Sequence, residues 1–174
     1  KQQIAAEVWG DASAIDPDKN YTPMNEYKAN FAWWFIVTDV LHDSLTLCNW
    51  VWPMTMGPTK ARDYRGDLDL EAKFMKAVTG EDVTKEDLYK MGAKITTLQR
   101  ANTARGMVGT NGQMGTDDFR NVHDVVTEWP FTMDPDIEVF TEGTNKMDKE
   151  DFQTALTMMY ECFGWDPELG CPTA

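Results

Sequence analysis

The chain has 174 residues, of which 42% are hydrophobic, and it carries a net charge of −13 with a pI near 4.4. A chain of this length can bury one good core, which predicts one domain. Its acidity argues against nucleic acid and against anionic membrane surfaces as partners, because phosphate binding needs clusters of Lys and Arg that the sequence does not contain.

The three cysteines, Cys48, Cys162 and Cys171, are an odd number at wide spacings, which is not the pattern of a disulfide framework. The sequence does not open with the basic segment, apolar segment and cleavage site of a secretory signal. We therefore predict a cytoplasmic protein. The first residue is Lys1 and not Met, which suggests a processed product or a fragment of a longer protein.

Residues 1–9 can form a short helix, and a loop rich in Asp and Pro then reaches Pro23. The next helix is predicted from about Asn25 to Asp43. Its segment 31–37 (FAWWFIV) is almost entirely apolar, so we expect it to be a central element buried on all sides. This run is far shorter than the ~20 residues of a membrane-spanning helix, and Asp and His follow it, which favours a helix of the core.

A third helix can be capped by Asp67 or Asp69, and Gly80 is a typical stop signal at its end. Its apolar residues recur at helical spacing and predict an inward face. That face consists of Leu70, Phe74, Ala77 and Val78.

A fourth helix is indicated by Thr84 and Asp87, which have the spacing of a capping box. We expect this helix to run through about Thr103 and to end at Gly106. Its predicted inward face is formed by Leu88, Met91, Ile95 and Leu98.

The polar, glycine-rich segment 109–118 is predicted to be a loop, and a short strand is expected near residues 136–140. Asp148 can cap a last helix that ends before Gly164. Its predicted inward face consists of Phe152, Ala155, Leu156, Met159, Tyr160 and Phe163. The predicted fold class is therefore all-α, an irregular helical bundle of about five helices.

One region combines ionisable groups with a thiol at the end of the apolar helix. Taken alone, Cys48 is more often a small packing residue than a ligand. His42 and Asp43 strengthen the functional interpretation, because a thiolate with a nearby hydrogen-bonding group makes a plausible ligand environment. Cys162 and Cys171 lie in no Cys-x-x-Cys pair, which argues against a self-contained zinc or iron–sulfur site.

The segment 43–48 (DSLTLC) resembles the second Asp-x-x-Gly-Leu-Cys motif of the tungsten-containing aldehyde ferredoxin oxidoreductase family. Further segments agree with this family in order and spacing: 77–88 (AVTGEDVTKEDL), 92–106 (GAKITTLQRANTARG), 147–166 (MDKEDFQTALTMMYECFGWD) and the ending Cys171-Pro172-Thr173. The resemblance covers residues 25–174, with residues 1–24 as a loop-rich lead-in. It implies that residues 1–174 are a single C-terminal helical domain of a larger enzyme, whose N-terminal and middle domains are its partners.

The resemblance implies oxidation of an aldehyde and water to a carboxylate. The reaction takes place at tungsten, or molybdenum, held by two pterins, and the electrons leave through a [4Fe-4S] cluster to ferredoxin. By position, Asp43 would accept hydrogen bonds from a pterin and Cys48 would be the fourth cluster ligand. The residues that would line the pterin are Ser44, Leu45, Thr46 and Leu47.

The other three cluster ligands of the family belong to a Cys-x-x-Cys-x-x-x-Cys run in the middle domain, which this sequence does not contain. We therefore expect the isolated chain to hold no cofactor and to be inactive. The family's motif glycine is replaced by Thr46, a departure that bears either on the tightness of the turn or on how closely the backbone approaches the pterin. Of an Arg and a paired Asp that the family shows after Gly106, only Asp117-Asp118 remain.

Two other interpretations stay open. One is a related tungstopterin enzyme with another substrate, such as an aromatic-ring-reducing benzoyl-CoA reductase. The other is a helical interaction module without a cofactor, in which Asp43 and Cys48 would simply face solvent. A homodimer is also compatible with the sequence.

Overall fold

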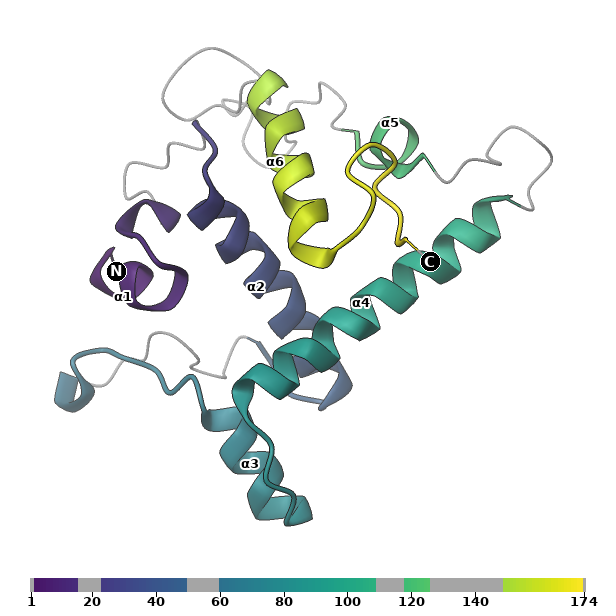
Figure 1. The fold of residues 1–174 in the computed structure, drawn as a ribbon. Coiled ribbons are helices and arrows are strands. Elements are labelled where there is room, and N and C mark those ends of the chain that lie inside the picture. Colours follow the sequence, from purple (N-terminus) through teal and green to yellow (C-terminus); the bar gives the residue numbers. More distant parts are fainter. Residues whose placement is uncertain (1, 16–22, 50–59, 109–117, 126–148, 174) are drawn as a thin grey trace. The chain divides into compact units, whose positions relative to one another are not determined.

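The computed structural model of the chain describes residues 2–15, 23–49, 60–108, 118–125 and 149–173. Its regular structure is helical (Figure 1), and an isolated antiparallel bridge joins Trp165 and Pro172. The α-helices are α1 (Gln2–Trp9), α2 (Glu26–Ser44), α3 (Leu70–Thr79), α4 (Lys85–Val108), α5 (Phe119–Val122) and α6 (Lys149–Phe163), and short 3₁₀ helices cover Ala12–Ala14 and Lys60–Arg62. The all-α prediction is confirmed.

All five predicted helices are present, and the four-residue helix α5 is an additional element that the sequence did not predict. Among the described helices, none combines the length and the apolarity needed to cross a bilayer. The predicted loop over 109–117, the predicted strand near 136–140 and the predicted cap Asp148 lie outside the described residues.

The chain forms two compact units. The first unit consists of Lys1–Trp33 and Thr97–Ala174, and the second unit consists of Trp34–Thr96. The helices α2 and α4 each contribute residues to both units.

Aromatic side chains form much of the core of the first unit. The ring of Trp9 in α1 meets the ring of Phe31 in α2 edge to face, with 4.6 Å between the ring centroids. At the end of α6, Phe163 stacks on Trp165 with a centroid distance of 4.5 Å. Such pairs contribute about 0.5–1.5 kcal/mol beyond the area that they bury.

A charged network connects α4, α5 and the C-terminal segment of the first unit. The guanidinium of Arg100 lies 3.9 Å from the centroid of the Phe119 ring, pairs with the carboxylate of Asp124 and donates to the Gly170 carbonyl over 2.9 Å. The Tyr160 hydroxyl donates to the same carboxylate over 2.7 Å. Burial alone would raise the pKa of Asp124, but the hydrogen bonds from Arg100 and Tyr160 lower it.

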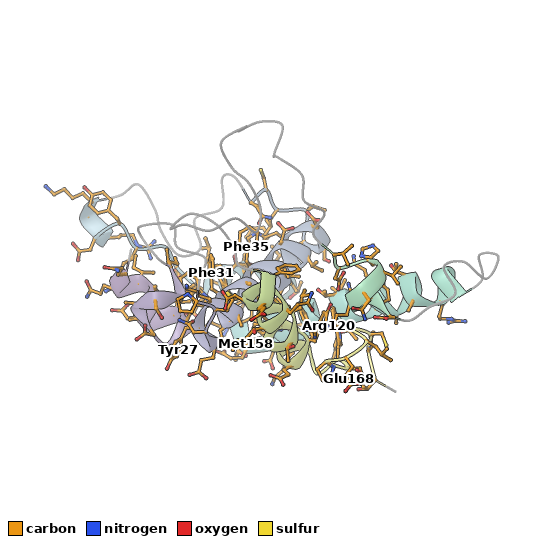
Figure 2. All side chains as sticks on the ribbon, turned by 90° about the horizontal axis from the view of Figure 1, so that it is seen from above. Tyr27, Phe31, Phe35, Arg120, Met158 and Glu168 are labelled. Atoms are coloured by element: carbon orange, nitrogen blue, oxygen red, sulfur yellow. The ribbon has the colours of Figure 1, made fainter. Side chains whose placement is uncertain are left out.

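The short helix α5 is held by the side chain of Arg120, which is labelled in Figure 2. Its guanidinium donates to the backbone carbonyls of Gln153 and Pro167 over 2.6 Å each, and to the Thr157 hydroxyl over 3.0 Å. The Asp118 carboxylate caps the first turn by accepting from the Asn121 N–H over 3.1 Å. A helix of four residues is not stable alone. These contacts therefore explain why α5 forms although the sequence has no helical periodicity there.

The helix α2 was predicted correctly, but the expectation that residues 31–37 are buried on all sides is wrong. Trp34, Val37 and Leu41 are buried, whereas Phe35 is 56% exposed and Ile36 is exposed as well. The buried residues follow helical spacing and form one stripe, and Phe35 and Ile36 lie outside it.

The helix α3 ends as predicted, because Gly80 follows it in the left-handed conformation (φ +80°). Its predicted inward face is wrong: Val78 is 68% exposed and Phe74 is also exposed, whereas Glu71 and Ala72 are buried. Met75, one turn further along the helix, is half-buried against the cluster that contains Ala72, so the inward face of α3 is formed by Glu71, Ala72 and Met75. The reason for burying a glutamate is its partner on α2, described below.

The capping box of α4 is confirmed: the Asp87 N–H donates to the Thr84 hydroxyl and the Thr84 N–H donates to the Asp87 carboxylate, each over 3.2 Å. The predicted end at Gly106 is wrong, because α4 continues to Val108. A glycine inside a helix costs only about 1 kcal/mol relative to alanine, so it weakens the helix without ending it.

The inward face of α4 was predicted only in part. Leu88 is buried, but Met91 and Leu98 are exposed. In the second unit α4 meets α2 at Gly92, where an added Cβ would lie 2.6 Å from the carbonyl oxygen and 2.9 Å from the Cγ1 atom of Val37. The close approach of the two backbones therefore requires glycine at this position.

Candidate functional site

The segment DSLTLC forms the C-terminal cap of α2. The Leu47 N–H donates to the His42 carbonyl over 2.9 Å, and the Thr46 N–H donates to the Asp43 carbonyl over 3.2 Å. Thr46 is in the left-handed conformation with φ +58°. These two bonds around a left-handed residue define the Schellman motif, so the motif turns the chain sharply at the end of the helix.

The left-handed position explains why a glycine suits this motif. The end of α6 has the same hydrogen-bond pattern, with Trp165 N–H to the Tyr160 carbonyl over 2.9 Å, and its left-handed residue is Gly164 (φ +69°). A left-handed conformation costs an L-residue roughly 1–2 kcal/mol, and it is unusual for a β-branched side chain. The tight turn is thus preserved at Thr46, at the expense of backbone strain.

The residues of the segment have different environments. Asp43, Ser44, Thr46 and Cys48 are exposed, and Leu45 and Leu47 are half-buried. The side chain of Leu45 packs against the core cluster of the second unit, which consists of Leu41, Ala72 and Leu88. The carboxylate of Asp43 and the thiol of Cys48 are consequently available to a molecule outside this unit.

A buried pair lies directly behind this segment. His42 in α2 is 0% exposed, and its Nε2 atom is 2.9 Å from the Oε1 atom of Glu71 in α3, which is 5% exposed. The other ring nitrogen, Nδ1, bonds to the Oδ1 atom of Asn49. The amide nitrogen of Asn49 in turn donates to the carboxylate of Asp39.

The chemistry of these partners fixes the protons of His42. An ionised Asp39 carboxylate can only accept, so the Asn49 amide must direct its NH₂ group to Asp39 and its oxygen to His42. Both ring nitrogens then face acceptor oxygens, which favours the doubly protonated imidazolium. Burial alone would lower the pKa of His42, but hydrogen bonds to Glu71 and Asn49 and the charges of Glu71 and Asp39 raise it.

The sequence pointed to Asp43, His42 and Cys48, and it missed Glu71 and Asn49. Glu71 is 29 residues from its partner, and a glutamate in the first turn of a helix is normally solvated. Within the described residues, no group of three or more His, Cys, Asp or Glu side chains is placed to hold a metal ion. Cys162 is half-buried, its Sγ atom lies 3.7 Å from Asn30 Oδ1, and burial raises its pKa.

Residues 2–174 match the family model described as aldehyde ferredoxin oxidoreductase, domains 2 and 3. The match extends the resemblance noted for residues 25–174 through the lead-in. No solved structure matches the chain.

Proposed function

The chain belongs to the aldehyde ferredoxin oxidoreductase family, and on this premise we propose that it is the C-terminal helical domain of a tungstopterin, iron–sulfur enzyme that oxidises aldehydes. The whole enzyme would convert an aldehyde and water to a carboxylate and pass two electrons to ferredoxin. Its N-terminal and middle domains would complete the site. Three free cysteines support a cytoplasmic location.

The single observation that carries the proposal is the presentation of Cys48. Its thiol is exposed on a tight turn and is not part of the core, and a thiolate is the usual ligand of cluster iron. We propose Cys48 as one ligand of a [4Fe-4S] cluster whose other three ligands lie in the middle domain. When bound, the tungsten pterin and the cluster would supply oxygen transfer and the electron path.

The residues before Cys48 would contact the pterin. The Asp43 carboxylate is exposed and can accept hydrogen bonds from ring N–H groups. Ser44, Thr46 and Leu47 would line the pterin, and Leu45 would contribute its backbone because its side chain packs against the core. The short spacing from Asp43 to Cys48 would keep the pterin contact and the cluster ligand on one turn.

The test is Cys48→Ala in the intact enzyme, with Cys162→Ala as the matched control. We expect Cys48→Ala to lose most of the cluster iron, because alanine offers no ligand atom. Cys162→Ala should retain it, because the half-buried Cys162 acts as a packing residue. Iron analysis and electron paramagnetic resonance after dithionite reduction give the readout. Unchanged iron in Cys48→Ala would refute the ligand assignment.

The substrate is tested separately by aldehyde-dependent reduction of a viologen dye. We expect tungsten-loaded enzyme to reduce the dye with aldehydes. A loaded cluster without aldehyde oxidation would point instead to a related tungstopterin enzyme with another substrate, and a protein without either cofactor would point to an interaction module.

A further inference from the structure

The segment that carries Cys48 is fixed on both sides. On its N-terminal side the two Schellman hydrogen bonds tie Thr46 and Leu47 to the last turn of α2. On its C-terminal side Asn49, the residue next to Cys48, bonds through its side chain to Asp39 and His42 of the same helix. An exposed cysteine is thus held between two anchored neighbours.

Stability alone does not explain the buried pair behind this segment. Removing charges from water is expensive, and replacing a buried ion pair by apolar residues is often neutral or stabilising. The best-attested role of a buried ion pair is to specify one defined geometry. Here Glu71 fixes the imidazole of His42 from α3, and the imidazole in turn holds the amide of Asn49.

We propose that Asp39, His42, Asn49 and Glu71 form a positioning clamp that holds the thiol of Cys48 in one orientation toward its cluster. Glu71 fixes His42, Asp39 orients the amide of Asn49, and Asn49 holds the backbone beside Cys48. All four are positioning residues. The identity of the group bound by Cys48 rests on the proposed function, whereas the clamp itself rests on the contacts of the second unit.

The contacts of His42 with Asn49 and Glu71 argue against a direct acid–base role for this residue. Its ring is 0% exposed, and both nitrogens are engaged by the side chains of Asn49 and Glu71. A general acid or base must reach the proton that it transfers. His42 therefore acts through Asn49 on the segment that carries Cys48.

The first test is Asn49→Ala in the intact enzyme, which removes the link to the segment and leaves the pair of His42 and Glu71 in place. The matched control is Asp82→Asn, which removes an exposed ion pair with Lys76 in the same unit. We expect hydrogen–deuterium exchange of a peptide covering residues 45–49 to become about tenfold faster in Asn49→Ala. Exchange in Asp82→Asn should match the wild type.

The second readout is the cluster itself. Asn49→Ala should retain the iron but broaden the electron paramagnetic resonance signal and shift the midpoint potential, because the ligand sulfur is less well oriented. The same pattern is expected for Glu71→Gln, which keeps the shape of the side chain and removes its charge.

Two results would overturn the proposal. One is exchange at 45–49 equal to the wild type in both Asn49→Ala and Glu71→Gln. The other is a lower melting temperature in Glu71→Gln without a change in exchange or in the cluster signal, which would leave the pair a purely structural role. An intact enzyme that holds no cluster would refute the proposed function, and the exchange measurement would still decide the clamp.

Discussion

At the scale of single residues, Thr46 occupies a backbone conformation that glycine adopts at the end of α6. We expect Thr46→Gly to raise the free energy of unfolding by about 0.5–1 kcal/mol, because relief of the left-handed strain exceeds the larger chain entropy of glycine. The converse variant, Gly164→Thr, should lower it by about 1–2 kcal/mol. Urea titrations measure both, and a destabilising Thr46→Gly would show that side-chain contacts of Thr46 outweigh its strain.

The protonation of His42 makes stability depend on pH. Its pKa is raised in the folded chain, so the folded state binds this proton more tightly than the unfolded state. The stabilisation is complete below the unfolded pKa of about 6.5 and is lost as the pH rises through the raised folded value.

Unfolding free energies measured in urea should therefore fall as the pH rises from about 6.5 through the raised folded pKa of His42. His42→Gln should flatten this dependence, because glutamine does not titrate. An equal slope in the variant and the wild type would show that other groups cause it.

The sequence singled out Asp43 and Cys48 as candidate site residues because their motif is local and ends a strongly apolar helix. It could not locate Glu71 or Asn49, since whether a glutamate is buried depends on which residue another helix brings to it. The hydrogen bond that His42 donates to Asn49 likewise depends on the sharp turn at Thr46, which a threonine in the sequence does not predict.

At the scale of elements, helix ends were more predictable than helix faces. Gly80, Gly164 and the box of Thr84 and Asp87 act through bonds to their own turn, so a short stretch of sequence suffices. The face of α3 depends on the pair with His42, and the close contact of α4 depends on Gly92. Such tertiary effects are not encoded in the period of one helix.

The contact at Gly92 can be tested against a second helical glycine. Gly92→Ala should destabilise the chain by about 1–3 kcal/mol, because the new methyl group would meet the Val37 backbone. Gly106→Ala should stabilise it by about 0.5–1 kcal/mol, because a Cβ there meets nothing within 4 Å and alanine favours helix. Denaturant titrations compare the two, and similar effects of both variants would contradict the close approach.

At the scale of the whole molecule, we expect the isolated 174-residue chain to bind no [4Fe-4S] cluster as a monomer. A cubane needs about four protein ligands, and the sequence contains three cysteines. Iron and tungsten analysis with electron paramagnetic resonance after dithionite reduction measures this. A stoichiometric cluster in the monomeric chain would show that the division of ligands between domains is wrong.

The sequence fully anticipated the helical class, because capping signals and helical spacing recur along the chain. The assignment of residues 1–174 to a single domain stays a prediction, and the contacts divide the chain into two compact units with α2 and α4 shared between them. The hydrophobic periodicity of the sequence cannot reveal such a division, because it continues without interruption along each long helix.

The outward apolar side chains of α3 also affect how the chain behaves at high concentration. Phe74 and Val78 are four residues apart and share one face of the helix. A net charge of −13 keeps copies apart at low ionic strength. Raising the salt from 0.01 M to 1 M shortens the Debye length from about 30 Å to about 3 Å, and sulfate also strengthens apolar association. The chain should therefore stay monomeric in dilute salt, and it should precipitate at a low concentration of ammonium sulfate.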